Sequence, residues 1–572
     1  MKRGAVAALL VVVLGACSAT DEGGGADGGG FGGGNDGGSG GIGGSGGTGD
    51  GGTGGVGGTG GTGGTGGVEP VTIDWETCYL ESGRAECATL DMPLDRDDPA
   101  SPTIPFFVRR IKAQGESRGQ LWLLEGGPGV NGGQLGYYAD SFLLDLGLDI
   151  YMPDYRGVGR SGDLNCNGRT DPTSLCLAEL ENEFGEDLVR FSTSDAVRDV
   201  GDAIQLLRKP GEQVFVWGTS YGTVTAHRFL HLFPDLANGV VLDSSCGAAG
   251  CDFANAGVDM NQNASDIANL CAADPFCTSK LGSDPWSQVA DVLDRVEAGY
   301  CAAGVPSSIR PWVRALFAQL MGPMYMPSVG MALIYRLDRC NAADAAGIQN
   351  FFSIFLGGGS GWVIQDEVEQ SELLYYNIVL NEFWDPSVTL AELEAIEADL
   401  VATTGAVLYF PDVEEMWPWP RYEVPADLRT WADVDVPVLI LNGTLDAQTR
   451  HERMIDARDA FVGPNQHVVI VPYGTHGVFL GSAPTAADPD HTCGAAITRQ
   501  FLRAPTASLD TSCLAEQAPP RFDTADYQSY WFGTPDLYEN VSSAKPAIQE
   551  IDDPLVKAKI ARARAELQRP HR

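Results

Sequence analysis

A serine stands at the centre of the sequence Gly218-Thr219-Ser220-Tyr221-Gly222. The apolar run 214–217 before it predicts a buried strand, and the segment after it has helical periodicity. A Gly-x-Ser-x-Gly turn between strand and helix is typical of a nucleophile elbow, which lifts the hydroxyl above a sheet, and its glycines avoid clashes. The same pattern occurs at 37–41 and 43–47, inside a glycine-rich segment without strand or helix signals. The setting therefore predicts Ser220 as a nucleophile rather than a structural serine.

A serine nucleophile needs a base and an acid that orients the base. Asp446 follows the apolar run 436–441, and His476 follows the run 467–471. The carboxyl ends of parallel strands share one sheet edge, and Ser, acid and His then occur in the expected chain order. We predict that Asp446 orients His476 and that His476 takes the Ser220 proton, with Asp433 and Asp435 as alternative acids.

The other six histidines fit the base less well. His227 and His231 share a helix face but lack the intervening Glu of a zinc-protease motif, which favours packing or exposure. No Cys/His spacing resembles that of a zinc site, so we expect neither a metal nor a cofactor. The remaining histidines lie in a strand, at helix starts or in the tail: His467, His451, His491 and His571.

A glycine-rich turn supplies the third part of the predicted site. The strand predicted at 120–124 ends in Glu125-Gly126-Gly127-Pro128-Gly129. Glycine lets the backbone approach a substrate, so we assign the oxyanion hole to the Gly127 and Tyr221 N–H groups. Gly126 is the fallback, and a plain Gly-Pro turn is the alternative.

These residues need a sheet to position them. Buried strands are predicted at 120–124, 148–152, 214–217, 240–242, 436–441 and 467–471, and helices at 195–207, 223–233 and 450–461. Alternation of this kind predicts an α/β protein with a mostly parallel sheet and helices on both faces. Nearly 200 residues without comparable strand signals separate 240–242 from 436–441. We interpret them as a large helical cap inserted between strands, over the edge where ligands bind.

The chain begins with a targeting segment. Lys2 and Arg3 precede the short apolar run 5–14, which ends in Leu-Gly-Ala-Cys17 and resembles a bacterial lipobox. We expect acylation of Cys17 and anchorage to a membrane, with an ordinary secretory signal as the alternative; either way the protein is exported. The resulting division is 1–17 signal and lipobox, 18–68 flexible glycine-rich tether, 69–245 first part of the core, 246–430 cap, 431–520 second part of the core and 521–572 C-terminal extension.

Composition agrees with export. Thirteen cysteines leave twelve once Cys17 is set aside, and an even number in an exported chain predicts disulfides. A net charge of −39 argues against a nucleic-acid partner and against binding of an anionic bilayer by charge. Pairing by proximity gives Cys78–Cys87, Cys166–Cys176, Cys246–Cys251, Cys271–Cys277, Cys301–Cys340 and Cys493–Cys513, although sequence alone does not fix the connectivity.

The motif Gly126-Gly127-Pro128-Gly129, the segment PDYRGVGRSG at 153–162 and the elbow resemble the prolyl and tripeptidyl aminopeptidases. The resemblance covers about 85–515 and implies an α/β-hydrolase fold with a helical cap and exopeptidase activity. The elbow and the late Cys493 and Cys513 are more similar to the secreted tripeptidyl branch. One departure is Glu125, where the family usually has His, which leaves the exact substrate open.

The family binds the amino terminus of its substrate with acidic residues near the cap. Glu382 is the matching candidate, with Glu369 and Glu372 behind it and a solvated acidic helix face as the alternative. We therefore expect a serine hydrolase that cleaves peptides near a free amino terminus through an acyl-enzyme. An esterase or lipase is the chemical alternative, because one fold and triad serve many acyl groups. A non-catalytic surface-binding lipoprotein is the alternative from another class.

Overall fold

A computed structural model describes residues 73–78, 85–166, 174–323, 326–356, 370–411, 419–485, 491–523 and 528–540. Cys17, the tether, Glu369 and the end of the C-terminal extension lie outside the described residues. The strands are β1 (Glu76–Cys78), β2 (Ala85–Pro93), β3 (Thr103–Ile111), β4 (Gly119–Leu124), β5 (Asp149–Pro153), β6 (Gln213–Thr219), β7 (Gly239–Asp243), β8 (Val438–Gly443) and β9 (Gln466–Val471).

These strands form one sheet in the order β1-β2-β3-β5-β4-β6-β7-β8-β9. Strands β4 to β9 run parallel to one another, which confirms the mostly parallel sheet. On one side the sheet is extended by the antiparallel pairs β1–β2, β2–β3 and β3–β5, and of these strands β1, β2 and β3 were not predicted. Because the parallel strands run in one direction, the loops after β6, β8 and β9 leave the same sheet edge.

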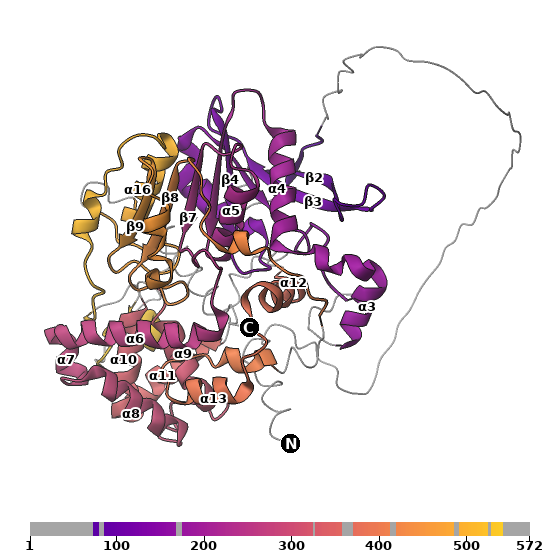
Figure 1. Ribbon diagram of the computed structural model, residues 1–572. Coiled ribbons are helices and arrows are strands. Elements are labelled where there is room, and N and C mark those ends of the chain that lie inside the picture. The colour runs from indigo at the N-terminus through magenta and orange to yellow at the C-terminus, as the bar shows by residue number, and fades with distance from the viewer. Residues whose placement is uncertain are drawn as a thin grey trace, which may run out of the picture. The chain divides into compact units, whose positions relative to one another are not determined.

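Both faces of the sheet are buried, as expected for strands without polar alternation. Alternate side chains of β6 belong to two different cores: Val214 and Val216 face one, and Phe215 and Trp217 face the other. The first core includes α4 (Thr193–Leu207) and α5 (Tyr221–Leu232), and the second includes α16 (Cys493–Arg503). Helices therefore cover both faces, as predicted (Figure 1).

A large helical cap is inserted between β7 and β8, which confirms the predicted insertion. Helices α6 to α11 gather beyond one end of the strands in Figure 1 and have a separate hydrophobic core, whereas α12 and α13 pack into the first core of the sheet. The helices are α6 (Ala256–Ala273), α7 (Pro275–Leu281), α8 (Pro285–Glu297), α9 (Val313–Leu320), α10 (Pro327–Arg339), α11 (Ala342–Leu356), α12 (Glu372–Ile378) and α13 (Leu390–Ala398).

The C-terminal segment returns to this cap. Helix α17 (Gln528–Phe532) and the residues after it contribute Trp531, Leu537 and Tyr538 to the cap core. The Arg336 guanidinium of α10 donates to the Leu537 carbonyl at 2.5 Å and to the Asn540 side chain at 2.7 Å. Residues 528–540 thus pack into the cap core and bind α10, a role that the sequence did not indicate.

Six disulfides are present, and all six are the pairs predicted by proximity. Disulfides persist in oxidising compartments, so they indicate an extracellular or otherwise oxidising location. Within the described ranges, no helix is both long and apolar enough to span a bilayer. The remaining helices are α2 (Gly136–Tyr138), α3 (Ser174–Phe184) and α15 (Ala457–Ala460).

Candidate active site

Ser220 lies at the turn between β6 and α5. Its backbone has φ 59° and ψ −128°, a left-handed conformation that costs a non-glycine residue about 1–3 kcal/mol. A Cβ on Gly218 would collide with the Gly222 carbonyl oxygen, and a Cβ on Gly222 would collide with that of Leu124. The two glycines thus permit the tight strand-to-helix turn expected of a nucleophile elbow.

The glycine-rich loop after β4 packs directly against this serine. A Cβ on Gly126 would lie 3.0 Å from the Ser220 Cβ and 3.4 Å from its Oγ. The Gly126 N–H donates to the Glu125 carboxylate at 2.8 Å, while the Tyr155 hydroxyl donates to the Glu125 carbonyl at 3.0 Å. Glu125, in the position where the resembling family has His, therefore braces the loop with both its side chain and its backbone.

The cap closes over the same loop. The Ser371 N–H donates to the Gly129 carbonyl at 2.8 Å, just before α12 begins at Glu372. A Cβ on Gly129 would lie 2.5 Å from the Ser371 carbonyl oxygen, so only glycine allows this approach. The candidate oxyanion loop is thereby fixed between the nucleophile turn and the cap.

Asp446 and His476 form a buried pair. The His476 Nδ1 lies 3.0 Å from both Asp446 carboxylate oxygens, and His476 and Asp446 are 5% and 1% exposed. Asp446 follows β8 and His476 follows β9, so neighbouring parallel strands deliver them to one sheet edge. The Leu445 N–H donates to the Gly474 carbonyl at 2.9 Å, which joins the two loops next to the pair.

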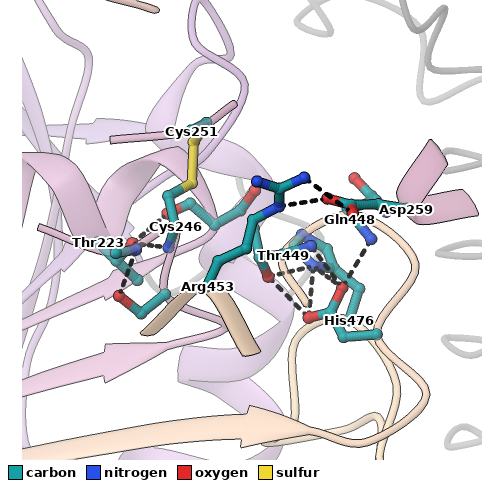
Figure 2. Close-up of a disulfide and its surroundings, with 12 residues drawn as sticks. Thr223, Cys246, Cys251, Asp259, Gln448, Thr449, Arg453 and His476 are labelled. Atoms are coloured by element: carbon teal, nitrogen blue, oxygen red, sulfur yellow. Dashed lines mark hydrogen bonds and ion pairs between the residues drawn. A yellow bond between two sulfur atoms is a disulfide. The ribbon is translucent and has the colours of Figure 1, made fainter. Parts of the chain in front are cut away.

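Thr449 completes the surroundings of the carboxylate. Its N–H and hydroxyl donate to Asp446 at 2.9 and 2.8 Å, and the Gln448 N–H donates at 2.9 Å. The Thr449 Oγ1 also lies 3.3 Å from the His476 Nδ1 (Figure 2). Burial raises the pKa of Asp446, but the imidazole and these donors outweigh burial and leave the pKa below its ordinary value. The carboxylate is thus held ionised against His476.

The start of the cap is fastened beside this pair. Arg453 binds the Asp259 carboxylate of α6 through Nε at 2.6 Å and Nη2 at 2.9 Å, and Asp252 through Nη1 at 2.7 Å. Figure 2 also shows the disulfide Cys246–Cys251, and the Cys246 N–H donates a hydrogen bond to the Thr223 hydroxyl. The loop that follows Asp446 therefore also carries the contact that holds α6.

Glu382 occupies a different environment from the one expected of an amino-terminus binder. It is buried, and its carboxylate accepts from the Arg228 guanidinium at 2.7 Å, the Thr193 N–H at 2.9 Å and the Tyr422 hydroxyl at 3.0 Å. The buried Arg228 guanidinium already neutralises the negative charge with which Glu382 would have to attract a substrate ammonium. The structure therefore argues against the role that the resemblance implied for Glu382.

The structure thus brings together Asp446 and His476, and it brings Ser220 together with Gly126. It adds three supporting residues that sequence reasoning missed: Thr449, Tyr155 and Asp243, whose carboxylate accepts from the Val478 and Phe479 N–H groups on the loop of His476. Among the described residues, no group of three or more His, Cys, Asp or Glu is arranged to hold a metal ion.

Two family models match the chain. A model described as alpha/beta hydrolase fold matches residues 121–271, which include Ser220. A model described as TAP-like protein matches residues 414–513, which include Asp446 and His476. Most of the cap lies between the two matched ranges.

Solved structures give distant matches. A proline iminopeptidase from Mycobacterium smegmatis is 16% identical, covering 73% of this chain and 98% of that chain, with a TM-score of 0.34. A proline iminopeptidase-related protein from Thermus thermophilus is 14% identical, covering 69% and 91%, with a TM-score of 0.30. An epoxide hydrolase from an endophytic Streptomyces is 16% identical, covering 68% and 90%, with a TM-score of 0.29. The comparison with curated proteins finds no match.

Proposed function

The chain is a TAP-like α/β hydrolase, and we propose that it is a serine hydrolase that cleaves peptide bonds near a free amino terminus. The triad is Ser220, Asp446 and His476. The observation that carries this proposal is the buried Asp446–His476 pair, which leaves the sheet at the same edge as the strained Ser220 turn. Three groups with these chemistries at one edge fit acyl transfer.

In this mechanism the Ser220 hydroxyl attacks the substrate carbonyl while His476 takes its proton. Asp446 accepts from the Nδ1 of the resulting imidazolium, and His476 then protonates the leaving amine. Water, deprotonated by the same imidazole, hydrolyses the acyl-enzyme and restores the serine. The Tyr221 and Gly127 N–H groups stabilise the oxyanion. The fallback donor, Gly126, is disfavoured because its N–H is engaged by the Glu125 carboxylate.

Glu372 is the better candidate for contact with the substrate amino terminus. It is half-buried at the first turn of α12, and its neighbour Ser371 contacts Gly129 of the oxyanion loop. A carboxylate that binds the substrate ammonium beside the oxyanion loop would limit cleavage to a few residues from the terminus. Glu372→Gln should raise KM for free-amino peptides about 10-fold or more, since an ion pair with the ammonium is lost. Glu382→Gln, measured on the folded fraction because Arg228 loses its buried partner, serves as the matched control and should leave KM within about 3-fold.

The test begins with covalent labelling. A fluorophosphonate probe should label the wild-type enzyme at Ser220 and fail to label Ser220→Ala, read by peptide mass. A peptide-library digest should then yield fragments released from the amino end, and acetylation of that end should abolish turnover. Undiminished cleavage of acetylated peptides would refute the exopeptidase assignment while leaving the serine hydrolase intact.

Ester hydrolysis is the second candidate, and one observation favours it. The cap carboxylate expected to bind an ammonium, Glu382, is already compensated by Arg228. Turnover of aminoacyl nitroanilides and of nitrophenyl esters should be compared on the same enzyme preparation. A kcat/KM for esters more than about 100-fold above that for free-amino anilides, with no effect of Glu372→Gln, selects the esterase.

We also propose that the enzyme is anchored to a membrane by a lipid on Cys17, with the segment 18–68 between the anchor and the catalytic core. The six disulfides support an oxidising location. Cells expressing the full chain with an alkyne-bearing fatty acid should yield labelled protein, and Cys17→Ser should yield none. Equal labelling of the wild-type chain and of Cys17→Ser would contradict the lipid anchor at Cys17.

A further inference from the structure

The loop that carries His476 is held along three consecutive residues. The Gly477 N–H donates to the Ser244 Oγ at 2.7 Å, the Val478 N–H to the Asp243 Oδ1 at 2.7 Å and the Phe479 N–H to the Asp243 Oδ2 at 3.1 Å. All three acceptors lie at the end of β7, more than 230 residues earlier in the chain. Both oxygens of one carboxylate are therefore used to fix the backbone next to His476.

The same residue is bonded to the nucleophile turn. The Ser220 N–H donates to the Asp243 backbone carbonyl at 3.0 Å, and Thr219 is the register partner of Asp243 across β6 and β7. Asp243 is fully buried, at 0% exposure. Its backbone thus holds the serine while its side chain holds the histidine loop.

Aromatic packing also supports this loop. The Phe479 ring lies 4.7 Å from the Trp217 ring of β6 and 5.5 Å from the Tyr138 ring, centroid to centroid. These ring contacts pack the loop against β6. The hydrogen bonds to Asp243 fix the backbone of the loop relative to the strand end that is bonded to Ser220. On the acid side, the Leu445–Gly474 hydrogen bond plays the corresponding part.

We infer that Asp243 is a positioning residue for the reaction, which acts through the backbone of residues 477–479 to hold the His476 ring at the height that the Ser220 hydroxyl requires. This inference rests on the proposed triad. Asp243 touches neither substrate nor the transferred proton. Its effect arises because proton transfer and nucleophilic attack depend steeply on the relative placement of the reacting groups.

A chemical asymmetry makes the inference testable. An ionised carboxylate accepts two N–H groups, whereas an amide of the same shape presents one oxygen and one NH₂ group. In Asp243→Asn the NH₂ group must face either the Val478 or the Phe479 N–H, so two donors oppose each other and the loop shifts. The backbone carbonyl that holds Ser220 is unchanged by the substitution.

The matched control is Asp199→Asn. Asp199 is another buried carboxylate, at 1% exposure, which lies on α4, accepts from Arg156 and Arg96 and is not bonded to the His476 loop. Both variants should unfold at lower denaturant concentration. For Asp243→Asn we expect kcat to fall about 10–100-fold with KM within about 3-fold, and for Asp199→Asn we expect kcat within about 3-fold. Equal kcat losses in the two variants would overturn the inference.

A double-mutant cycle isolates the path of the effect. If Asp243 acts through His476, its substitution should matter little once His476 is gone. Adding Asp243→Asn to His476→Ala should then lower the fluorophosphonate labelling rate, or the residual turnover, by less than about 2-fold. A further 10-fold loss in that background would show that Asp243 acts elsewhere and would overturn the inference. If wild-type protein is not labelled at Ser220, the triad itself fails, which is a different result.

Ser244→Ala keeps the test open if Asp243→Asn does not fold. It removes the acceptor of the Gly477 N–H and leaves the Asp243 carboxylate in place. We expect kcat to fall about 3–10-fold with KM unchanged, because one of three backbone contacts is lost. A wild-type kcat in folded Ser244→Ala, together with a non-folding Asp243→Asn, would assign Asp243 to folding alone and overturn the inference.

Discussion

Two histidines of this protein are almost equally buried and have opposite surroundings. His227, seven residues after Ser220 on α5, is 3% exposed, and its Nε2 accepts the Ala432 N–H at 3.1 Å. His476, on the loop after β9, is 5% exposed, and its Nδ1 lies 3.0 Å from both Asp446 oxygens. Burial, together with electrostatic repulsion from the neighbouring His231 and Arg228, lowers the pKa of His227 to about 3.

The comparison shows that the partner, and not the degree of burial, decides what a buried imidazole does. An N–H donor fixes His227 as a neutral acceptor, so it serves packing on α5. A carboxylate accepts from the Nδ1 of His476 and favours the imidazolium that forms when a serine is deprotonated. Two residues of the same type are thus assigned to structure and to chemistry by a single neighbouring group.

The largest expected effect follows from removing the imidazole beside Asp446. We expect His476→Ala to lower kcat/KM by about 10⁵-fold or more, because Ser220 loses its base. Initial rates on a free-amino peptide anilide, corrected for the active fraction, measure the loss. Retention of more than about 1% of wild-type activity would mean that another group deprotonates the serine, and the contrast between the two histidines would lose its functional meaning.

A smaller loss is expected when the imidazole stays and its partner changes. Asp446→Asn keeps the shape of the side chain, but its NH₂ group meets the donors of Gln448 and Thr449 or the protonated Nδ1. The wrong tautomer of His476 is then favoured, and kcat should fall about 10³–10⁴-fold with KM little changed. Rates measured across pH test this, and a loss below about 10-fold would show that Asp446 is not the orienting acid.

The sequence predicted the elements whose signal is local. The six parallel strands read as unbroken apolar runs because they are buried on both faces, and α4 and α5 have clear helical periodicity. The antiparallel β2 and β3 were not predicted, because exposed residues interrupt both. The helix predicted at 450–461 is broken into a short turn, His451–Met454, and α15, and its residue Arg453 reaches across to α6.

For the site, chain order was sufficient to pair Asp446 with His476, since both follow strands of one parallel sheet. Asp243 could not be found in this way, because its carboxylate binds backbone N–H groups, which have no sequence signature. The surroundings of Glu382 could not be foreseen for a related reason: its partner Arg228 is 154 residues away, and only the fold reveals that the charge is compensated.

The ion pair of Glu382 and Arg228 should affect stability rather than turnover. Arg228→Met leaves a buried carboxylate without its cation and should lower the free energy of unfolding by about 3–5 kcal/mol. Adding Glu382→Gln should recover much of that loss, because no uncompensated charge remains. Urea unfolding measures both variants, and kcat of the folded fraction should stay within about 3-fold of wild type. If the double variant selectively loses activity on free-amino peptides, Glu382 contacts the substrate after all.

The smallest effect on turnover is expected at His227, where the consequence is a change in how stability depends on pH. The folded-state pKa of about 3 lies below the ordinary value near 6.5, so between these values the unfolded chain binds a proton that the folded protein does not. His227 therefore lowers the free energy of unfolding as pH falls through this window, by about 1.4 kcal/mol per pH unit.

His227→Gln still offers an oxygen to the Ala432 N–H but does not titrate. The slope of the free energy of unfolding against pH, between about pH 4 and 6, should therefore flatten by about that amount, while kcat at about pH 8 is unchanged. Urea unfolding at several pH values gives the slope for both proteins. An identical slope in the variant would mean that the folded protein does not exclude a proton from this imidazole, and the neighbouring N–H donor would then not explain its structural role.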